Sequence, residues 1–523
     1  MLKNIAIKTK LPLGVTTFAK MRDKKENYLY VDKTDIAYNL IDNGIYYFLS
    51  RPRRFGKSLF LDTLADIFLG KKELFKGLYI YNKWDWEESY PVIRIDFAKG
   101  NLIDSDDLKE KIQEILEENE KTLDVKCDND IYDRKCFSTL IKNVYDKYNQ
   151  KVVILIDEYN KPLLDNIINT DIVKDMRDGL GNFYSVIKGS DQYIKFVFMT
   201  GVSKFSKMNL FSGLNNLQDI TIMKKYSTIC GYTHNDIKTT FKEHLEDVNL
   251  DKLKEWYNGY NYFGDAVYNP YDILLFISNE CEYRNYWWST GNPRFLIEKL
   301  KTSSYNIPQM ESIITTSETL DSFDIEHIDL VALLWQTGYL TFDKKIIEDD
   351  ELLGYKMKIP NKEIQKSLNT LFINYLTNQP TDIITHQSGL RKFLKDDNLD
   401  NLKTILTALF ASIPYNNYVK NELSHYEGYY ATVVFTYLVS LGFECVTEDA
   451  TNKGRIDLTI KLPNRIVIIE FKVDVKEKAL KQIKERKYYE KYMDDGREIF
   501  IVGICFSSED KNITEFEWEK INF

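Results

Sequence analysis

The 523-residue sequence predicts an α/β protein of several domains. In the amino-terminal half, β-branched runs alternate with amphipathic stretches, a pattern typical of a parallel sheet with crossover helices. The middle is rich in helical and aromatic segments. Near the carboxyl end, two strand-like segments flank Pro463-Asn464 and carry acids that a hairpin would bring together. The predicted class is therefore a parallel sheet, a helical and winged-helix-like middle, and a carboxyl-terminal αβ domain.

Composition limits the classes of protein that the chain can belong to. A hydrophobic content of 44% is sufficient for large cores, and we expect three domains at residues 1–230, 231–400 and 401–523. No apolar run approaches the roughly 18 residues that cross a bilayer, so we expect a cytoplasmic protein without a membrane partner. The net charge of -9 disfavours a protein that coats nucleic acid by bulk electrostatics. The six cysteines form no Cys-x-x-Cys pair and are interpreted as reduced core thiols.

A phosphate-binding loop is predicted at residues 51–58. The strand-like run 44–50 leads into Arg-Pro-Arg-Arg-Phe-Gly-Lys-Ser, and a helix follows at 59–69. Backbone amides at the start of that helix would face phosphates. Lys57 would reach the terminal phosphates, and the Ser58 hydroxyl would bind Mg²⁺. The nucleotide-binding residues predicted in this loop are Arg54, Gly56, Lys57 and Ser58.

Two further strands are predicted to end in polar residues at the same edge of the sheet. The apolar run 151–159 ends in Asp157 and Glu158. The run 193–200 ends in Thr200. Open parallel sheets bind ligands at this edge, where Asp157 would hold Mg²⁺ through water, Glu158 would polarise the hydrolytic water, and Thr200 would sense the γ-phosphate. A crossover helix between the strands is indicated by Val173, Met176, Leu180, Phe183 and Ile187.

The middle of the chain has two features that bear on function. Aromatic residues with glycines and asparagines at 255–263 and 286–293 are interpreted as a lid packed on the nucleotide-binding core, with base stacking as the alternative. The order helix, strand, strand, helix of a winged-helix-like unit is predicted at 330–338, 339–343, 355–359 and 361–376. Such units bind DNA in some proteins and only join domains in others, and both interpretations stay open.

The strands predicted at 455–462 and 465–473 hold the strongest candidate for a catalytic site. A turn between them pairs residues whose numbers sum to 927, so that Asp457 lies opposite Glu470. Like charges this close destabilise a sheet unless they are neutralised, and a hard divalent cation binds such oxygens. Lys472 follows on the same face, where its ammonium is placed to orient an attacking water.

A fourth acid, Glu427, opens a helix predicted to run to about Leu441, and its carboxylate is expected to reach the same metal. The alternative is that the acids face solvent and that Lys472 is their ion partner. The apolar run before Glu470 argues for a buried strand, in which an acid and a lysine are costly without partners. The predicted order is helix, three strands, helix and strand at 427–441, 443–447, 455–462, 465–473, 476–492 and 498–506.

Five phrases of the amino-terminal half resemble the AAA-ATPase-like domain found in many bacterial proteins. In that family an arginine-bearing loop replaces the usual first glycine of the phosphate loop, as Arg51 does here. The resemblance implies ATP binding, and it leaves hydrolysis open. The phrases are Tyr30-Val-Asp-Lys-Thr34, Arg51-Pro-Arg-Arg-Phe-Gly-Lys-Ser58, Leu155-Ile-Asp-Glu-Tyr159, Thr200-Gly-Val-Ser-Lys-Phe205 and Phe211-Ser-Gly-Leu-Asn-Asn216.

The carboxyl-terminal order, with Asp457 ahead of Glu470-Phe471-Lys472, resembles the PD-(D/E)xK nuclease superfamily. The resemblance implies phosphodiester cleavage dependent on Mg²⁺ or Mn²⁺. It places metal ligands at Asp457, Glu470 and Glu427. Ile456 stands where the superfamily name has Pro. Gln482 is similar to a supporting Gln of some members, whereas Arg486 stands where a Tyr is usual.

The leading hypothesis is an ATP-binding, metal-dependent nuclease whose ATPase-like module regulates cleavage of nucleic acid, DNA in the first place. Two alternatives are kept: a nucleotide-gated module that binds nucleic acid or protein without cutting, and an ATP-driven motor. Assembly into a homo-oligomer is left open. Nucleic-acid contact is expected on a lysine-rich helix, for which an ordinary solvated face is the equal alternative, at Lys476, Lys478, Lys481, Lys484, Arg486, Lys487 and Lys491.

Overall fold

The structure is a computed structural model. It describes residues 9–100, 102–127, 134–167, 169–204, 214, 216–287, 313–321, 329–377, 383–395, 399–413, 427–475 and 478–521. These residues divide into two compact units, the first comprising residues up to 287 and 313–363, and the second those from 364 onward. Within the described ranges, every helix is too short or too polar to cross a membrane.

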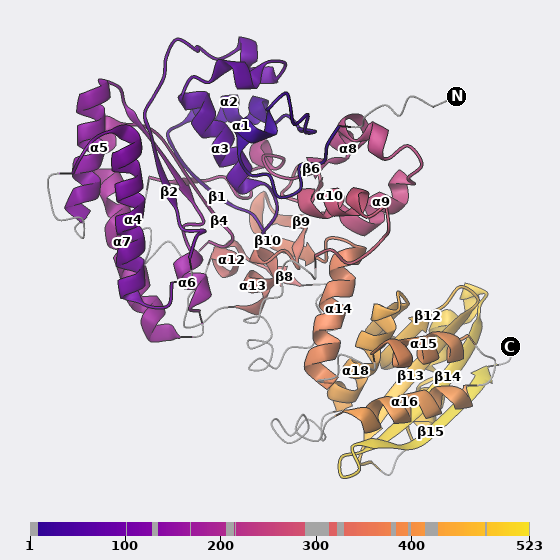
Figure 1. Ribbon diagram of the computed structural model, residues 1–523. Helices are drawn as coiled ribbons and strands as arrows, with labels where there is room; N and C mark the ends of the chain where they lie inside the picture. Colours follow the sequence, from indigo (N-terminus) through magenta and orange to yellow (C-terminus); the bar gives the residue numbers. More distant parts are fainter. Residues whose placement is uncertain are drawn as a thin grey trace, which may run out of the picture. The chain divides into compact units, whose positions relative to one another are not determined.

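A five-stranded sheet with the order β2-β3-β4-β1-β5 is the centre of the first unit (Figure 1). All of its pairings are parallel, which confirms the predicted α/β class. All six side chains of β3 are buried, as expected of an apolar strand covered on both faces. The outer strands β2 and β5 were not anticipated from the sequence. The strands are β1 (Tyr46–Ser50), β2 (Val92–Asp96), β3 (Val152–Asp157), β4 (Ile194–Gly201) and β5 (Gln218–Asp219).

Helices cover both faces of this sheet, with α4, α5 and α7 on one side and α1, α2 and α3 on the other (Figure 1). The predicted apolar stripe of the crossover helix is buried in α7. Asn119 of α4 protects the free edge of β2, because its amide accepts from the N–H of Arg94 at 2.9 Å and donates to the carbonyl of Arg94 at 2.7 Å. The helices are α1 (Phe18–Met21), α2 (Thr34–Asn43), α3 (Lys57–Phe68), α4 (Ser105–Leu123), α5 (Arg134–Tyr148), α6 (Lys161–Asp165) and α7 (Thr170–Gly189).

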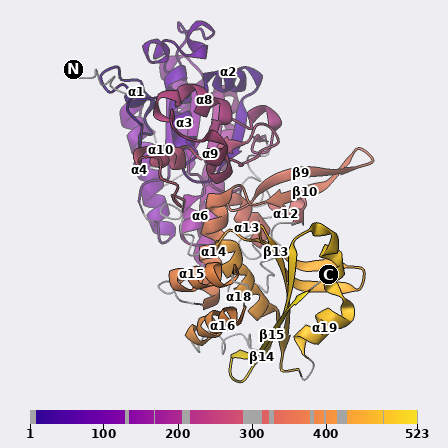
Figure 2. The same ribbon diagram turned by 90° about the vertical axis from the view of Figure 1, so that its right-hand side faces the viewer.

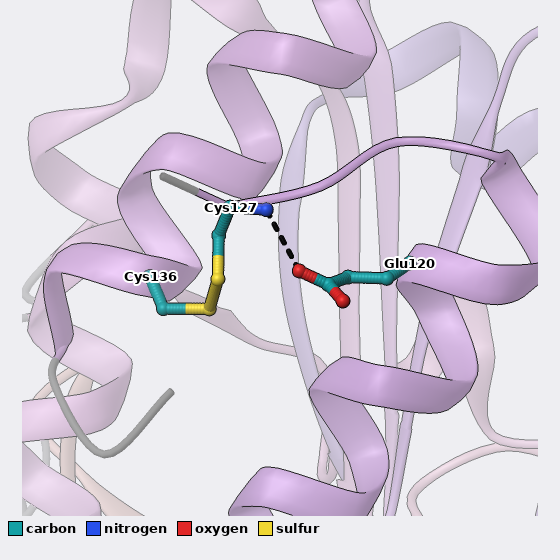
Figure 3. A group of neighbouring side chains, drawn as sticks. All are labelled: Glu120, Cys127 and Cys136. Atoms are coloured by element: carbon teal, nitrogen blue, oxygen red, sulfur yellow. Dashed lines mark hydrogen bonds between the residues drawn. A yellow bond between two sulfur atoms is a disulfide. The ribbon is translucent and has the colours of Figure 1, made fainter. Parts of the chain in front are cut away.

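A disulfide joins the segment after α4 to the first turn of α5 (Figure 3). The bond between Cys127 and Cys136 shows that the expectation of six reduced cysteines is wrong for these two. Glu120 accepts from the N–H of Cys127 at 2.7 Å, and the Asn143 amide donates to the carbonyl of Lys126 at 2.7 Å. These contacts fold the segment back along α5, and the spacing of the cysteines gives no sign of them. The cysteines outside the disulfide are Cys230, Cys281, Cys445 and Cys505.

Glu120, Cys127 and Cys136 are close enough to one another to be considered as metal ligands. Their bonding does not suit a cation, however. Both sulfurs are consumed by the disulfide, and a thiolate is the form of cysteine that binds metals. The Glu120 carboxylate is committed to the N–H of Cys127 and to the Lys126 ammonium, which lies 2.9 Å away. The cluster is therefore a covalent and hydrogen-bonded link between α4 and α5.

In the described part of the region that follows the sheet, aromatic side chains pack into a core; residues 288–293 of the second predicted aromatic segment lie outside the described residues. Trp256, Tyr257 and Tyr268 are buried in one apolar cluster, and Tyr260 and Trp287 are buried beside it. This burial favours the interpretation of a packed lid over base stacking. The elements are β6 (Tyr232–Thr233), α8 (His234–Thr240), α9 (Leu250–Tyr257), β7 (Val267–Tyr268) and α10 (Pro270–Ser278).

The winged-helix-like order of helix, two strands and helix is confirmed, with a hairpin longer than predicted. Figure 2 shows β9 and β10 as a ribbon that extends away from α12 and α13. Four acids form its tip, Glu348 to Glu351, and such a tip repels phosphate. This disfavours the wing as a DNA-binding element. The elements are β8 (Ile314–Thr315), α12 (Ser317–Asp321), α13 (Leu330–Gln336), β9 (Thr341–Glu348), β10 (Glu351–Lys358) and α14 (Lys362–Thr377).

The second unit contains a mixed sheet with the order β11-β12-β13-β14-β15, in which β13 and β14 are parallel. Figure 2 shows α18 on one face and α19 on the other. The predicted last helix is divided into α19 and a 3-10 segment (Tyr488–Asp495) because Lys487 adopts a φ of 52°. The strand β15 was not anticipated. The elements are α15 (Ile383–Phe393), α16 (Asp400–Ser412), α18 (Glu427–Ser440), β11 (Glu444–Thr451), β12 (Gly454–Lys461), β13 (Arg465–Val473), α19 (Ala479–Arg486), β14 (Glu498–Ser507) and β15 (Asn512–Ile521).

Two carboxyl side chains are buried against each other in the first unit. Asp272 of α10 and Glu363 of α14 are each 1% exposed and share a hydrogen bond. Glu363 also accepts from the N–H groups of Tyr286 at 2.6 Å and Trp287 at 2.9 Å. Burial raises the pKa of Asp272 to about 7, and burial together with the Asp272 charge raises the pKa of Glu363 well above its usual value. The pair therefore stabilises the first unit most when it carries a proton.

We predict that the stability of the first unit falls as pH rises from about 4 to about 7. The folded chain binds more protons than the unfolded chain in this window, because the pKa of Asp272 is about 7 in the fold against 3.8 ordinarily. The stabilisation that this proton provides is complete below the ordinary pKa of 3.8, and it is lost as pH rises through about 7. Asp272→Asn should remove a pH dependence on the order of 3 kcal/mol, measured by urea unfolding at about pH 5 and about pH 8. The exposed Asp265→Asn is the control, and the same pH dependence in both variants would contradict the prediction.

Candidate functional site

The loop between β1 and α3 has the backbone of a phosphate-binding loop. Gly56 precedes α3 with a φ of +94°, a left-handed conformation that favours glycine even though a β-carbon would have room there. The first turn of α3 opens onto a cavity of about 510 Å³. Gly56, Lys57, Ser58 and Glu158 all line this cavity. Free backbone amides at a helix start attract anions, so the geometry suits phosphate.

Lys57 lies at the floor of this cavity. Its side chain is 4% exposed, and its ammonium donates to the carbonyls of Arg51 at 3.0 Å and Pro52 at 3.3 Å. The Glu158 carboxylate lies 3.6 Å away. A buried ammonium is costly without such partners. A buried positive charge thus lies at the first residue of α3, where it contacts the backbone of the loop.

Asp157 and Ser58 meet at the end of β3. The Ser58 hydroxyl is hydrogen-bonded to the Asp157 carboxylate, and Asp157 is 7% exposed. Burial, followed by the charge of Glu158, raises the pKa of Asp157 to about 6, although the Ser58 bond and Lys57 act in the opposite direction. Glu158 adopts a φ of 47°, a conformation that few non-glycine residues adopt. The structure thus brings Lys57, Ser58, Asp157 and Glu158 together.

The two other predicted nucleotide contacts differ in position. Arg54 is exposed, lines the cavity, and places its guanidinium 4.4 Å from the centre of the Tyr271 ring. Thr200 is the penultimate residue of β4, but it is fully buried and does not line the cavity. Within the described ranges, its hydroxyl has no hydrogen-bond partner. The roles of both residues stay predictions.

Much of the remaining wall of the cavity is apolar. It comes largely from the amino-terminal segment and from the lid, and Thr16, Arg53 and Lys161 add polar groups. Ligand pockets commonly combine such a wall with a few polar groups that fix orientation. A flat apolar group attached to a phosphate chain would fit both parts. The apolar and aromatic residues of the lining are Pro12, Val15, Met21, Leu59, Ala98, Leu164, Tyr232, Pro270, Tyr271 and Leu274.

Arg51, which replaces the first glycine of the loop, is a structural clamp that the sequence alone does not reveal. Its side chain is 1% exposed and donates to the carbonyls of Ser50 at 2.8 Å and Thr221 at 2.7 Å. A third bond reaches the carbonyl of Tyr226 at 3.3 Å. The guanidinium also lies 3.6 Å from the centre of the Tyr262 ring. Arg51 therefore ties the loop to the segment after β5 and to the lid.

In the second unit, β12 and β13 have the predicted register. Leu458 pairs with Ile469 and Thr459 with Ile468, so that residue numbers sum to 927 as expected. At the next residue, the Asp457 carboxylate accepts from the backbone N–H of Phe471 at 2.8 Å. This bond holds the Asp457 side chain beside the backbone of β13 next to Glu470.

Glu470 is buried within the apolar strand β13, and two side chains satisfy one of its oxygens. It is 1% exposed. The Lys472 ammonium lies 3.4 Å from Oε1, and the side-chain amide of Gln482 on α19 donates to the same oxygen. A buried carboxylate is tolerated only with such partners. The burial excludes the interpretation of Glu470 as a solvent-facing strand residue.

Glu427 begins α18 as predicted, but its side chain lies outside the described residues. The start of the helix can nevertheless be located. Tyr430, one turn later, stacks on Phe506 with 4.1 Å between ring centres. Phe506 pairs with Val473, the last residue of β13. The amino-terminal turn of α18 is therefore near the end of β13 that carries Glu470 and Lys472.

The lysine-rich surface of α19 and the segment after it is largely neutralised. Lys478 lies 2.7 Å from both Glu515 and Glu517 of β15. Lys484 pairs with Glu519, and Lys491 with the buried Asp449. These ion pairs favour the interpretation of a solvated helix face over that of a nucleic-acid surface. Lys481 and Lys487 have carboxylate partners at 3.5 and 3.7 Å, Arg486 donates to the carbonyl of Lys453, and Lys476 lies outside the described residues.

Comparisons with known proteins match both parts of the chain. Residues 12–211 match the model of a predicted AAA-ATPase family, and residues 425–516 match the PD-(D/E)XK nuclease superfamily. An uncharacterized protein in the vnfD 5' region of Azotobacter chroococcum mcd 1 is 42% identical over 520 residues, which cover 98% of this chain and 99% of the relative. The similarity to that protein therefore extends across both units.

We predict that Arg51→Lys destabilises the first unit by about 3 kcal/mol, because an ammonium cannot serve three carbonyls and stack on a ring as the guanidinium does. Arg53→Lys in the same loop is the control, since Arg53 is exposed and should change stability by less than about 0.5 kcal/mol. Urea unfolding of the full chain measures both. Equal stability of the two variants would contradict the assignment of Arg51 as a clamp.

Proposed function

Because the chain belongs to the family of proteins that join a predicted AAA-ATPase domain to a PD-(D/E)XK nuclease superfamily domain, we propose that it is an ATP-binding, metal-dependent nuclease. In this proposal the ATPase-like module regulates cleavage of nucleic acid, and DNA is the expected substrate. The observation that carries it is the burial of Glu470 between Lys472 and Gln482, with Asp457 fixed beside the same strand.

The acids and the lysine have the chemistry that phosphodiester cleavage requires. Asp457 and Glu470 supply the hard oxygen ligands that Mg²⁺ or Mn²⁺ prefers, and Glu427 is the proposed third carboxylate. A bound ion of this kind acts as a Lewis acid and lowers the pKa of a bound water. Lys472 is positioned by Glu470 to orient the attacking water or to offset charge on the phosphate.

The loop before α3 is the proposed site for the phosphates of ATP. The helix start and Lys57 would bind the phosphate chain, and Ser58 with Asp157 would hold Mg²⁺. Glu158 is the proposed base for hydrolysis, and Arg54 and Thr200 are proposed as phosphate contacts. The apolar wall of the cavity would receive the base.

A nucleotide-gated interaction module that binds a partner without cutting is the second candidate. Its support is electrostatic. Lys478 and Lys484 are paired with carboxylates of β15, and the tip of the wing is acidic. Both features disfavour broad contact with nucleic acid. A nuclease of this kind would therefore have to contact its substrate close to the Glu470 site.

We predict that Asp457→Ala lowers cleavage by about 100-fold or more, because it removes one of the three proposed carboxylate ligands of the metal ion. Cleavage of labelled single- and double-stranded DNA and RNA in Mg²⁺ or Mn²⁺ is the measurement. Glu444→Gln is the control, since this exposed acid begins β11 and pairs with Lys461. Unchanged cleavage by Asp457→Ala would overturn the assignment. A wild-type protein that binds nucleotide but cuts nothing would favour the second candidate.

We predict that Lys57→Met weakens ATP binding by about 100-fold, because a buried ammonium at the helix start contributes several kcal/mol to phosphate binding. Titration with a fluorescent ATP analogue measures the affinity, and cleavage assays with and without ATP test regulation. The exposed Lys83→Met is the matched control. Equal ATP affinity in both variants would exclude the loop before α3 as the phosphate site.

A further inference from the structure

Two residues of β14 lie beside the proposed catalytic residues of β13. In the parallel pairing of these strands, Gly503 is the partner of Glu470, and Cys505 is the partner of Lys472. The helix α19 packs over both strands. The contacts of Gly503 and Cys505 with α19 therefore determine where this helix lies relative to the site.

Gly503 allows an unusually close approach of helix and strand. A β-carbon at this position would lie 2.2 Å from the backbone nitrogen of Leu480 and 2.8 Å from its α-carbon, closer than real contacts allow. Both atoms belong to the backbone, so a side-chain rotation cannot relieve the clash. Glycine is required here because a β-carbon would not fit, and not because of the backbone conformation, since the φ of Gly503 is not left-handed.

Cys505 makes the second contact with the same turn of the helix. Its sulfur accepts a hydrogen bond from the backbone N–H of Ala479, the first residue of α19. The first N–H groups of a helix have no partner within the helix, so this contact satisfies a group that would otherwise be exposed or unpaired. Cys505 is 9% exposed and is a free thiol. Its role is thus that of a buried acceptor rather than a reactive group.

The position of this first turn determines whether the side chain of Gln482 can reach Glu470. Leu480 and Ile483 of α19 are buried in the same apolar cluster as Ile466 and Ile468 of β13. Gln482, between them in sequence, donates to Glu470. Relieving the clash of an added methyl group requires a shift of about 1 Å, which is enough to break a side-chain hydrogen bond.

We propose that Gly503 and Cys505 form a helix seat, which holds the first turn of α19 against β14 and so places Gln482 on Glu470. Both are positioning residues for cleavage, acting through Gln482. The inference rests on the proposed nuclease function. It adds two residues of β14 to the proposed site formed by Asp457, Glu470 and Lys472.

A double-mutant cycle on the full chain tests the helix seat. Gly503→Ala and Gln482→Ala should each lower the cleavage rate in Mn²⁺ by about 10- to 100-fold, as expected for groups that orient a metal ligand. The double variant should be no slower than the slower single variant, because both changes remove one interaction. Multiplied effects would show that Gly503 acts independently of Gln482 and would overturn the proposal. The control is Gly189→Ala in α7, where a β-carbon meets nothing within 4 Å.

Cys505 provides a second test that does not depend on the tolerance of Gly503→Ala for folding. Cys505→Ala removes the acceptor and should slow cleavage about 10-fold, whereas Cys505→Ser retains an acceptor and should restore most of the rate. Wild-type rates in Cys505→Ala would count against the seat. Failure of the serine to rescue would show that packing, rather than the bond to Ala479, is responsible.

Hydrogen exchange separates failure of the helix seat from failure of the nuclease assignment. In the protein without added metal, Gly503→Ala and Cys505→Ala should speed backbone exchange in residues 479–486, whereas Gln482→Ala should not. If the wild type does not cleave, the nuclease assignment fails, and the exchange result still decides whether the seat exists. If the wild type cleaves and neither seat variant changes exchange or rate, only the helix seat is overturned.

Discussion

The second unit depends on the burial of one charge, the carboxylate of Glu470, inside an apolar strand. A carboxylate that is 1% exposed costs several kcal/mol unless neighbouring groups satisfy it. Lys472 supplies opposite charge from the same strand, and Gln482 supplies a hydrogen bond from α19. The second partner is available only because α19 lies against the backbone of β14 at Gly503. The sheet pairing, the helix position and the absence of a side chain at residue 503 are thus all needed to satisfy this buried acid.

In the loop before α3 and at the first residue of that helix, the first unit buries two cations rather than an acid. Arg51 is held by carbonyls of the end of β1 and of the segment after β5, and Lys57 is held by the carbonyls of Arg51 and Pro52. Arg51 thereby fixes the carbonyls that then receive Lys57. A conventional first glycine would shape such a loop by conformational freedom, whereas here a buried guanidinium shapes it by hydrogen bonding. Gly56 is retained because its left-handed φ is still required.

What the sequence predicted correctly depended on local patterns. The apolar stripe of α7 and the register of β12 with β13 follow from periodicity and turn length, which neighbours in sequence determine. The disulfide between Cys127 and Cys136 and the pairing of lysines on α19 with β15 depend on tertiary contacts, so spacing and composition could not reveal them. The three-domain division and the chemical roles of the site residues stay predictions.

Both candidate sites place a lysine beside an acid that has a proposed role in the reaction. Lys57 lies 3.6 Å from Glu158, and Lys472 lies 3.4 Å from Glu470. A phosphate carries more negative charge than one carboxylate and would compete with each acid for its lysine. Under the proposed function, phosphate binding would therefore free each acid for a water or a metal ion at the moment when substrate is present. The low exposure of both lysines strengthens this competition, because solvent screens it little.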